Sequence, residues 1–196
     1  MFNQDLRNIS NIISENIVET DAGSIDFGLI DYIGKPPGLI HHLIECSLKH
    51  NTFILDNLSK WSSSNIEMVK NWKDDDDLLI TQNQAFFSAC RFALVNPRLQ
   101  KAVPISLIRE PLPVDHKMYF IMKIDPANDL IALSNGIEYT IYLQDHGTLR
   151  KFSENDRVII GFNSSDRLDS ISIDYYKSYL LIDTTCNSCV RANPVT

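Results

Sequence analysis

The chain has 196 residues, of which 44% are hydrophobic and 22% charged, and its formal net charge at pH 7 is −7. These fractions are typical of a folded soluble protein and argue against intrinsic disorder. The charge is −5 over residues 1–115 and −2 after them, so neither part offers the basic surface that nucleic acid or anionic lipid requires. We therefore expect neither a nucleic-acid partner nor a membrane partner.

The N-terminus is polar, and residues 1–10 lack the basic start and apolar run of a secretory signal peptide. No stretch approaches the roughly 18 apolar residues that a membrane-spanning helix needs. We therefore expect a cytoplasmic protein, in which the four cysteines are thiols rather than a disulfide framework.

Before Pro97 the apolar residues recur at helical spacing. Leu6, Ile9 and Ile13, for example, lie three or four residues apart. This periodicity predicts helices over residues 3–20, 39–48, 53–61, 66–72 and 78–95.

Local signals support the last two of these helices. Ser64 and Glu67 have the spacing of a capping box, and four aspartates at 74–77 precede the final helical run. Asn96 and Pro97 end that run, because the residue before proline is disfavoured in the helical region.

Prolines punctuate the middle of the chain, at positions 97, 104, 111 and 113. We expect a connection over residues 97–117, with a short strand at 105–108.

After Lys117 the apolar residues alternate with a period of two, which predicts strands. The pair Asn135-Gly136 between two alternating runs predicts a hairpin in which both turn residues have positive φ. The predicted strands lie at residues 119–124, 131–133, 137–143, 158–160, 171–176, 179–182 and 190–192.

This change of period predicts an α+β protein. An N-terminal helical region spans residues 1–100, a proline-punctuated connection spans 101–116, and a small antiparallel β domain spans 117–196. The last is expected to form a sheet or a partly closed barrel.

Cys186 and Cys189 form the one recognisable short motif, which is compatible with a redox dithiol or with half of a zinc site. A redox pair normally precedes a helix, but only seven residues follow Cys189. A zinc site needs about four ligands, and Cys46, Cys90 or His146 would have to converge on the pair. We favour a turn that happens to contain two thiols, and zinc stays the one cofactor worth testing.

His41 and His42, with Glu45 and Cys46, are a second group of ligand-type residues. On a helix the two adjacent histidines point about 100° apart, so they are a poor metal pair. We expect both to be solvated or to lie at the rim of the apolar stripe.

The aspartates at 74–77 lack the alternating ligands and central glycine of a calcium loop, so we expect a solvated helix start. The chain has no Gly-x-Ser-x-Gly turn and no phosphate-binding glycine loop. The sequence therefore leans against an enzyme, although scattered residues such as His41, His42 and His146 could still converge.

Six tyrosines fall in the β part, and we expect most of them to pack in the core or on the sheet. If Tyr142 and Tyr176 face outward, they form a candidate protein-binding patch. We therefore expect a non-catalytic binding or adaptor protein, whose β domain or its junction with the helices binds a protein partner or a small ligand. The alternatives are a thiol-redox or zinc-binding protein centred on Cys186 and Cys189 and, less favoured, a nucleic-acid-binding barrel.

Overall fold

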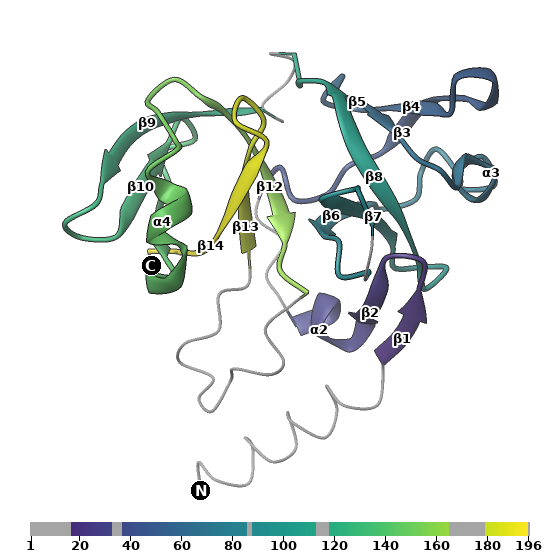
Figure 1. Ribbon diagram of the computed structural model, residues 1–196, viewed down its shortest axis with the longest axis horizontal. Coiled ribbons are helices and arrows are strands. Elements are labelled where there is room, and N and C mark those ends of the chain that lie inside the picture. The colour runs from purple at the N-terminus through teal and green to yellow at the C-terminus, as the bar shows by residue number, and fades with distance from the viewer. Residues whose placement is uncertain (1–16, 33–36, 86–87, 113–117, 165–178, 196) are drawn as a thin grey trace, which may run out of the picture.

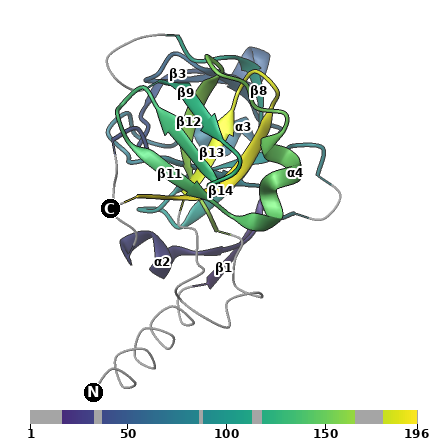
Figure 2. The same ribbon diagram turned by 90° about the vertical axis from the view of Figure 1, so that its left-hand side faces the viewer.

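The computed structural model describes residues 17–32, 37–85, 88–112, 118–164 and 179–195. Antiparallel strands dominate these residues and form two groups that lie side by side, with a small N-terminal hairpin beneath them (Figures 1 and 2).

The first group, which we call barrel 1, contains six strands in the spatial order β3-β4-β5-β8-β7-β6. An isolated antiparallel bridge between His41 and Leu78 joins the chain just before β3 to the chain just before β6. Its two backbone hydrogen bonds are both 2.9 Å long, and they close the barrel at one point. The strands are β3 (Leu43–Ser47), β4 (Thr52–Leu55), β5 (Lys60–Ser62), β6 (Leu79–Gln82), β7 (Phe92–Asn96) and β8 (Lys101–Arg109).

The second group, barrel 2, contains six strands in the order β9-β10-β11-β14-β13-β12, and β12 pairs back with β9. Every neighbouring pair is antiparallel, and the pairing of β12 with β9 closes this barrel. The strands are β9 (Tyr119–Asp125), β10 (Leu130–Leu133), β11 (Glu138–Ile141), β12 (Arg157–Phe162), β13 (Tyr179–Asp183) and β14 (Ser188–Pro194).

The two barrels share one topology. If the strands of each are numbered 1 to 6 along the chain, both have the spatial order 1-2-3-6-5-4. A short helical segment separates the third and fourth strands in each: α3 (Ile66–Val69) in barrel 1, and η2 (Leu143–Asp145) with α4 (His146–Leu149) in barrel 2. The remaining described elements are β1 (Ile17–Thr20), β2 (Gly23–Asp26), α2 (Phe27–Tyr32) and η1 (Leu48–His50).

The barrels are joined by strands that are buried on both faces. In β12, Val158 and Ile160 belong to the core of barrel 2, whereas Ile159 packs with the core of barrel 1. A Cβ at Gly161 would come within 2.7 Å of the backbone oxygen of Ile80 in β6. Only glycine fits where the two backbones approach so closely.

The prediction of an α+β fold with an N-terminal helical region is wrong. In the described part of residues 17–112, the chain forms the β1–β2 hairpin and barrel 1, and its helical segments are only short. Strands replace the predicted helices at 39–48, 53–61 and 78–95.

Double burial explains the error at residues 78–95. All five residues of β7 are buried, because one face lines barrel 1 and the other faces barrel 2. A strand covered on both sides reads as a continuous apolar run, which periodicity cannot distinguish from a buried helix.

A β-bulge explains the error at residues 39–48. The register of β3 on β4 shifts between Leu43 and Glu45, so Ile44 is an extra residue and is 55% exposed. The bulge interrupts the alternation and places two apolar residues side by side, which imitates a helical stripe.

Other helix signals had different outcomes. Residues 17–20 of the predicted first helix form β1, and residues 3–16 lie outside the described part. The apolar edge of Ile66, Val69 and Trp72 is buried as expected, but α3 contains only four residues. Asn65, not Ser64, is the N-cap residue of α3, and its side chain makes no capping bond.

The β predictions are confirmed at 105–108, 119–124, 131–133, 158–160, 179–182 and 190–192, and the strand predicted at 171–176 lies outside the described residues. The Asn135-Gly136 hairpin is confirmed between β10 and β11. Gly136 has a φ of +80°, whereas Asn135 is not among the described residues with positive φ, so the prediction that both need it is wrong.

Candidate functional site

A cavity of about 360 Å³ opens on barrel 1, beside the bridge that closes it. Four parts of the chain line it: α2, the segment that leads into β3, the acidic segment with the start of β6, and the turn between β7 and β8. The lining side chains combine an apolar wall with charged groups; they are Ile30, Leu39, Ile40, Lys73, Asp75, Asp76, Asp77, Leu79, Pro97 and Arg98.

Asp76 is the buried anchor of this cavity, with 3% of its surface exposed. Its carboxylate accepts hydrogen bonds from the Arg98 guanidinium (Nη2–Oδ2, 2.8 Å), from the Asn96 amide (2.7 Å) and from the Lys73 backbone N–H (3.0 Å). The Arg98 hydrogen bonds are the largest of the causes that hold the pKa of Asp76 far below its usual range. Asp76 is therefore a fixed anion that ties the acidic segment to the β7–β8 turn.

Two histidines and two aspartates form a chain of contacts next to the cavity. His42 Nδ1 lies 3.0 Å from Asp56 Oδ2, and its Nε2 lies 3.6 Å from Asp77 Oδ1. His41 Nδ1 lies 3.5 Å from the other oxygen of Asp56. Because Asp77 also lines the cavity, this chain of contacts reaches the cavity rim.

Barrel closure positions these groups. Residue 43 pairs with residue 55 in the β3–β4 hairpin, so His42 lies opposite Asp56. The His41–Leu78 bridge brings Asp77, the residue before Leu78, to the same place. His41 is fully buried, whereas the side chain of His42 is 38% exposed.

Excess negative charge marks the rim of the cavity. Arg98 balances Asp76, which leaves Asp75 and Asp77 against Lys73. Asp74, Asp75 and Asp77 are exposed; the first two lie in a turn and Asp77 follows it, so the prediction that this acidic segment begins a helix is wrong. Its buried member, Asp76, was not distinguishable from the other three by sequence.

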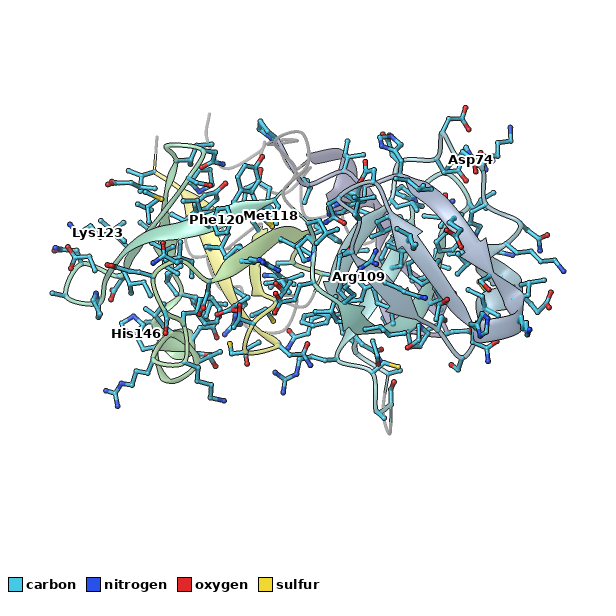
Figure 3. The ribbon with its side chains drawn as sticks, turned by 90° about the horizontal axis from the view of Figure 1, so that it is seen from above. Asp74, Arg109, Met118, Phe120, Lys123 and His146 are labelled. Carbon is cyan, nitrogen blue, oxygen red and sulfur yellow. The ribbon has the colours of Figure 1, made fainter. Side chains whose placement is uncertain are left out.

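The structure does not bring all three candidate histidines together. His41 and His42 belong to barrel 1, whereas His146 begins α4 in barrel 2 and pairs with Asp129 at 2.8 Å. Figure 3, seen from above, places Asp74 and His146 at opposite ends of the molecule. Glu45 is exposed and Cys46 packs against the core of barrel 1.

Cys186 and Cys189 are free thiols; Cys186 lies in the turn between β13 and β14, whereas Cys189 is the second residue of β14. Cys186 packs against the core of barrel 2, whereas Cys189 packs against that of barrel 1. Burial, as the largest cause, raises the pKa of each thiol to about 11. Redox and zinc chemistry need the thiolate, so this environment does not favour either function.

Next to this pair, Asp183 is fully buried at the end of β13. Its Oδ1 accepts the backbone N–H groups of Thr185 (2.8 Å) and Cys186 (3.1 Å). Burial, the largest cause, and the nearby carboxyl of Asp156 both act to raise the pKa of Asp183, which lies at about 6. Asp183 supports the β13–β14 turn and does not line the cavity.

Tyr142 precedes η2, and its ring is covered by the Arg191 guanidinium, whose carbon lies 4.1 Å from the ring centroid. Arg191 in turn pairs with Asp145 at 2.8 Å, so this face of the ring already has an intramolecular partner. Tyr176 lies outside the described residues. Tyr119, Tyr139 and Tyr179 are buried, as expected for core packing.

Two properties of the described residues bear on other functions. Those residues contain no group of three or more histidine, cysteine, aspartate or glutamate side chains that could hold a metal ion. None of the helices in this part of the chain is long and apolar enough to cross a membrane.

Comparison with known proteins adds no relative: no family model matches the chain, and neither a curated protein nor a solved structure is significantly similar to it.

Proposed function

We propose that this protein is a non-catalytic binding protein whose cavity on barrel 1 takes a small organic cation with an apolar body. The single observation that carries the proposal is the lining of the cavity, which combines an apolar wall with an excess of carboxylates. A cavity of about 360 Å³ is within the size range of small-molecule sites.

The apolar part of the ligand would lie against Leu39, Ile40 and Leu79, which come from two different segments. Burying apolar ligand surface there contributes most of the affinity, at roughly 25 cal/mol per Å² before the costs of association. The ammonium or guanidinium group would face Asp75 and Asp77, since Asp76 is already paired with Arg98. The net charge of −7 also attracts a cation over a longer range.

The test is isothermal titration of the full chain with 2-phenylethylamine, using 2-phenylethanol and 3-phenylpropionate as the neutral and anionic analogues. We expect the amine to bind most tightly and the carboxylate least. The double variant D75N/D77N should lose roughly two- to fivefold in affinity for each charge removed, as for exposed ion pairs.

The matched control is Asp74→Asn, because Asp74 belongs to the same acidic run and is exposed but does not line the cavity. This variant should bind the amine as the unaltered protein does. Equal affinity for all three analogues, or equal losses in D74N and in D75N/D77N, would refute the proposed site.

A further inference from the structure

We propose that a proton on His42 competes with the cationic ligand for Asp77, so that the occupancy of the cavity depends on pH. This inference rests on the proposed function and names how that same site is regulated. It is carried by the position of Asp77, which both lines the cavity and lies 3.6 Å from His42 Nε2.

The contact with Asp56 decides which nitrogen of the His42 imidazole carries the hydrogen. Asp56 Oδ2 lies 3.0 Å from His42 Nδ1, which is hydrogen-bond distance. A carboxylate only accepts hydrogen bonds, so the hydrogen of a neutral His42 ring resides on Nδ1. The lone pair of Nε2 then faces the carboxylate of Asp77.

Protonation of His42 would change its interaction with Asp77. A protonated imidazole carries a hydrogen on both nitrogens and pairs with Asp56 and Asp77 at once. At 3.6 Å the Nε2–Oδ1 contact is an ion-pair distance rather than a hydrogen bond, so it depends on charge. Protonation therefore offsets the negative charge that Asp77 presents to the cavity, and loss of the proton restores it.

Other titratable groups lie close to His42. Among the described residues, the charged contacts of His42 are Asp56 and Asp77, and His41 lies 3.5 Å from Asp56 on the far side. His41 is fully buried. The side chain of His42 is 38% exposed, so solvent reaches its ring.

By linkage, a proton and a cation that compete for one carboxylate weaken each other's binding by the same factor. The affinity for 2-phenylethylamine should therefore rise between pH 5.5 and pH 8, where the amine itself stays protonated. We expect a rise of roughly two- to fivefold, which corresponds to one half-exposed ion pair.

The experiment is isothermal titration of the full chain with 2-phenylethylamine at pH 5.5 and pH 8, in three proteins. The unaltered protein should show the rise. His42→Gln, whose amide can still donate to Asp56 but cannot take up a proton, should bind with a pH-independent affinity close to that of the unaltered protein at pH 8. His50→Gln is the matched control, since His50 is exposed in η1 and does not line the cavity.

The H42Q variant also separates His42 from Asp183, which belongs to barrel 2 and whose pKa of about 6 lies in the same pH range. Any contribution of Asp183 would persist in H42Q. Binding that lacks the pH dependence, or keeps it in H42Q, overturns this inference and leaves the proposed function standing. Absence of amine binding at both pH values overturns both.

Discussion

At the scale of single residues, Gly38 and Gly136 both have a positive φ but differ in how closely other atoms pack against them. Gly38 has a φ of +86° and precedes the cavity residue Leu39, whereas Gly136 has a φ of +80° in the β10–β11 turn. A Cβ at Gly38 would lie 2.5 Å from the Tyr119 ring, but a Cβ at Gly136 would meet nothing within 4 Å.

Gly38→Ala should therefore destabilise the protein more than Gly136→Ala. Each substitution costs about 1 kcal/mol for placing alanine at positive φ. Only the first also forces the buried Tyr119 ring to move, so we expect a further loss of about 1–3 kcal/mol. Urea unfolding of the two variants measures the difference, and equal losses would show that Gly38 is not closely packed on barrel 2.

Asp183 gives a prediction about pH. Its pKa is raised from 3.8 to about 6, so the folded protein holds this proton more tightly than the unfolded chain does. Between pH 4 and pH 6 the contribution of this group to the free energy of unfolding therefore falls as pH rises, and the full loss remains above pH 6.

Asp183→Asn should remove that loss, because the amide oxygen can still accept the two backbone hydrogen bonds. We expect the variant to be about 1–3 kcal/mol more stable than the unaltered protein at pH 8 and no more stable at pH 4. Denaturant unfolding at the two pH values measures this. A variant that is less stable at pH 8 would mean that the carboxylate is stabilising there.

At the scale of the elements, a strand with one exposed face shows alternation in its sequence, and a strand that is buried on both faces does not. The alternation in β9 follows from burial of Tyr119 and Ile121 beside exposed Met122. β7 and β13 have no exposed residue, so no alternation is visible. β13 was predicted as a strand from its short apolar run.

The candidate site was hidden for a related reason. Asp76 and Arg98 are 22 residues apart, and only the β6–β7–β8 meander brings them together. The contact between His42 and Asp56 follows from the β3–β4 hairpin, so recognising that hairpin would have predicted it. No local sequence signal distinguishes Asp76, since its burial depends on the β7–β8 turn.

The hydrogen bonds that Asp76 accepts from Asn96 and Arg98 lead to a prediction at this scale. Asp76→Ala leaves the Asn96 amide and the Arg98 guanidinium without their acceptor, and we expect a loss of about 2–4 kcal/mol in the free energy of unfolding at pH 7. Because the pKa of Asp76 is lowered by these bonds, its contribution is present above about pH 4 and declines below it.

Asp74→Ala is the control for the Asp76 variant, because Asp74 is exposed in the same acidic run. Substitutions at exposed positions usually change the free energy of unfolding by less than about 0.5 kcal/mol. Thermal and urea unfolding of both variants decide the point. Equal stability of the two variants would show that the acidic segment is not anchored through Asp76.

At the scale of the whole molecule, two barrels of one topology share their apolar surfaces. Leu180 and Ile182 of barrel 2 belong to the core of barrel 1, and Ala93 and Val95 of barrel 1 belong to the core of barrel 2. A shared core of this kind couples the stability of the two barrels, so we expect them to unfold together.

The chain provides a probe for this prediction, because Trp61 and Trp72 are its two tryptophans and both lie in the core of barrel 1. Tryptophan fluorescence should give the same urea midpoint as hydrogen exchange of the β9–β14 amides. Leu180→Ala should shift both midpoints together, with a loss of about 2–5 kcal/mol. Separate transitions would contradict a shared core.

The cavity beside the closing bridge of barrel 1 is the site that we propose binds a small organic cation. The most direct measurement is a two-dimensional amide NMR titration of the 22.3 kDa chain with 2-phenylethylamine. The account predicts saturable shifts at Leu39, Ile40, Leu79, Arg98 and residues 75–77, with barrel 2 amides unaffected. No saturable shift, or shifts confined to barrel 2, would contradict it.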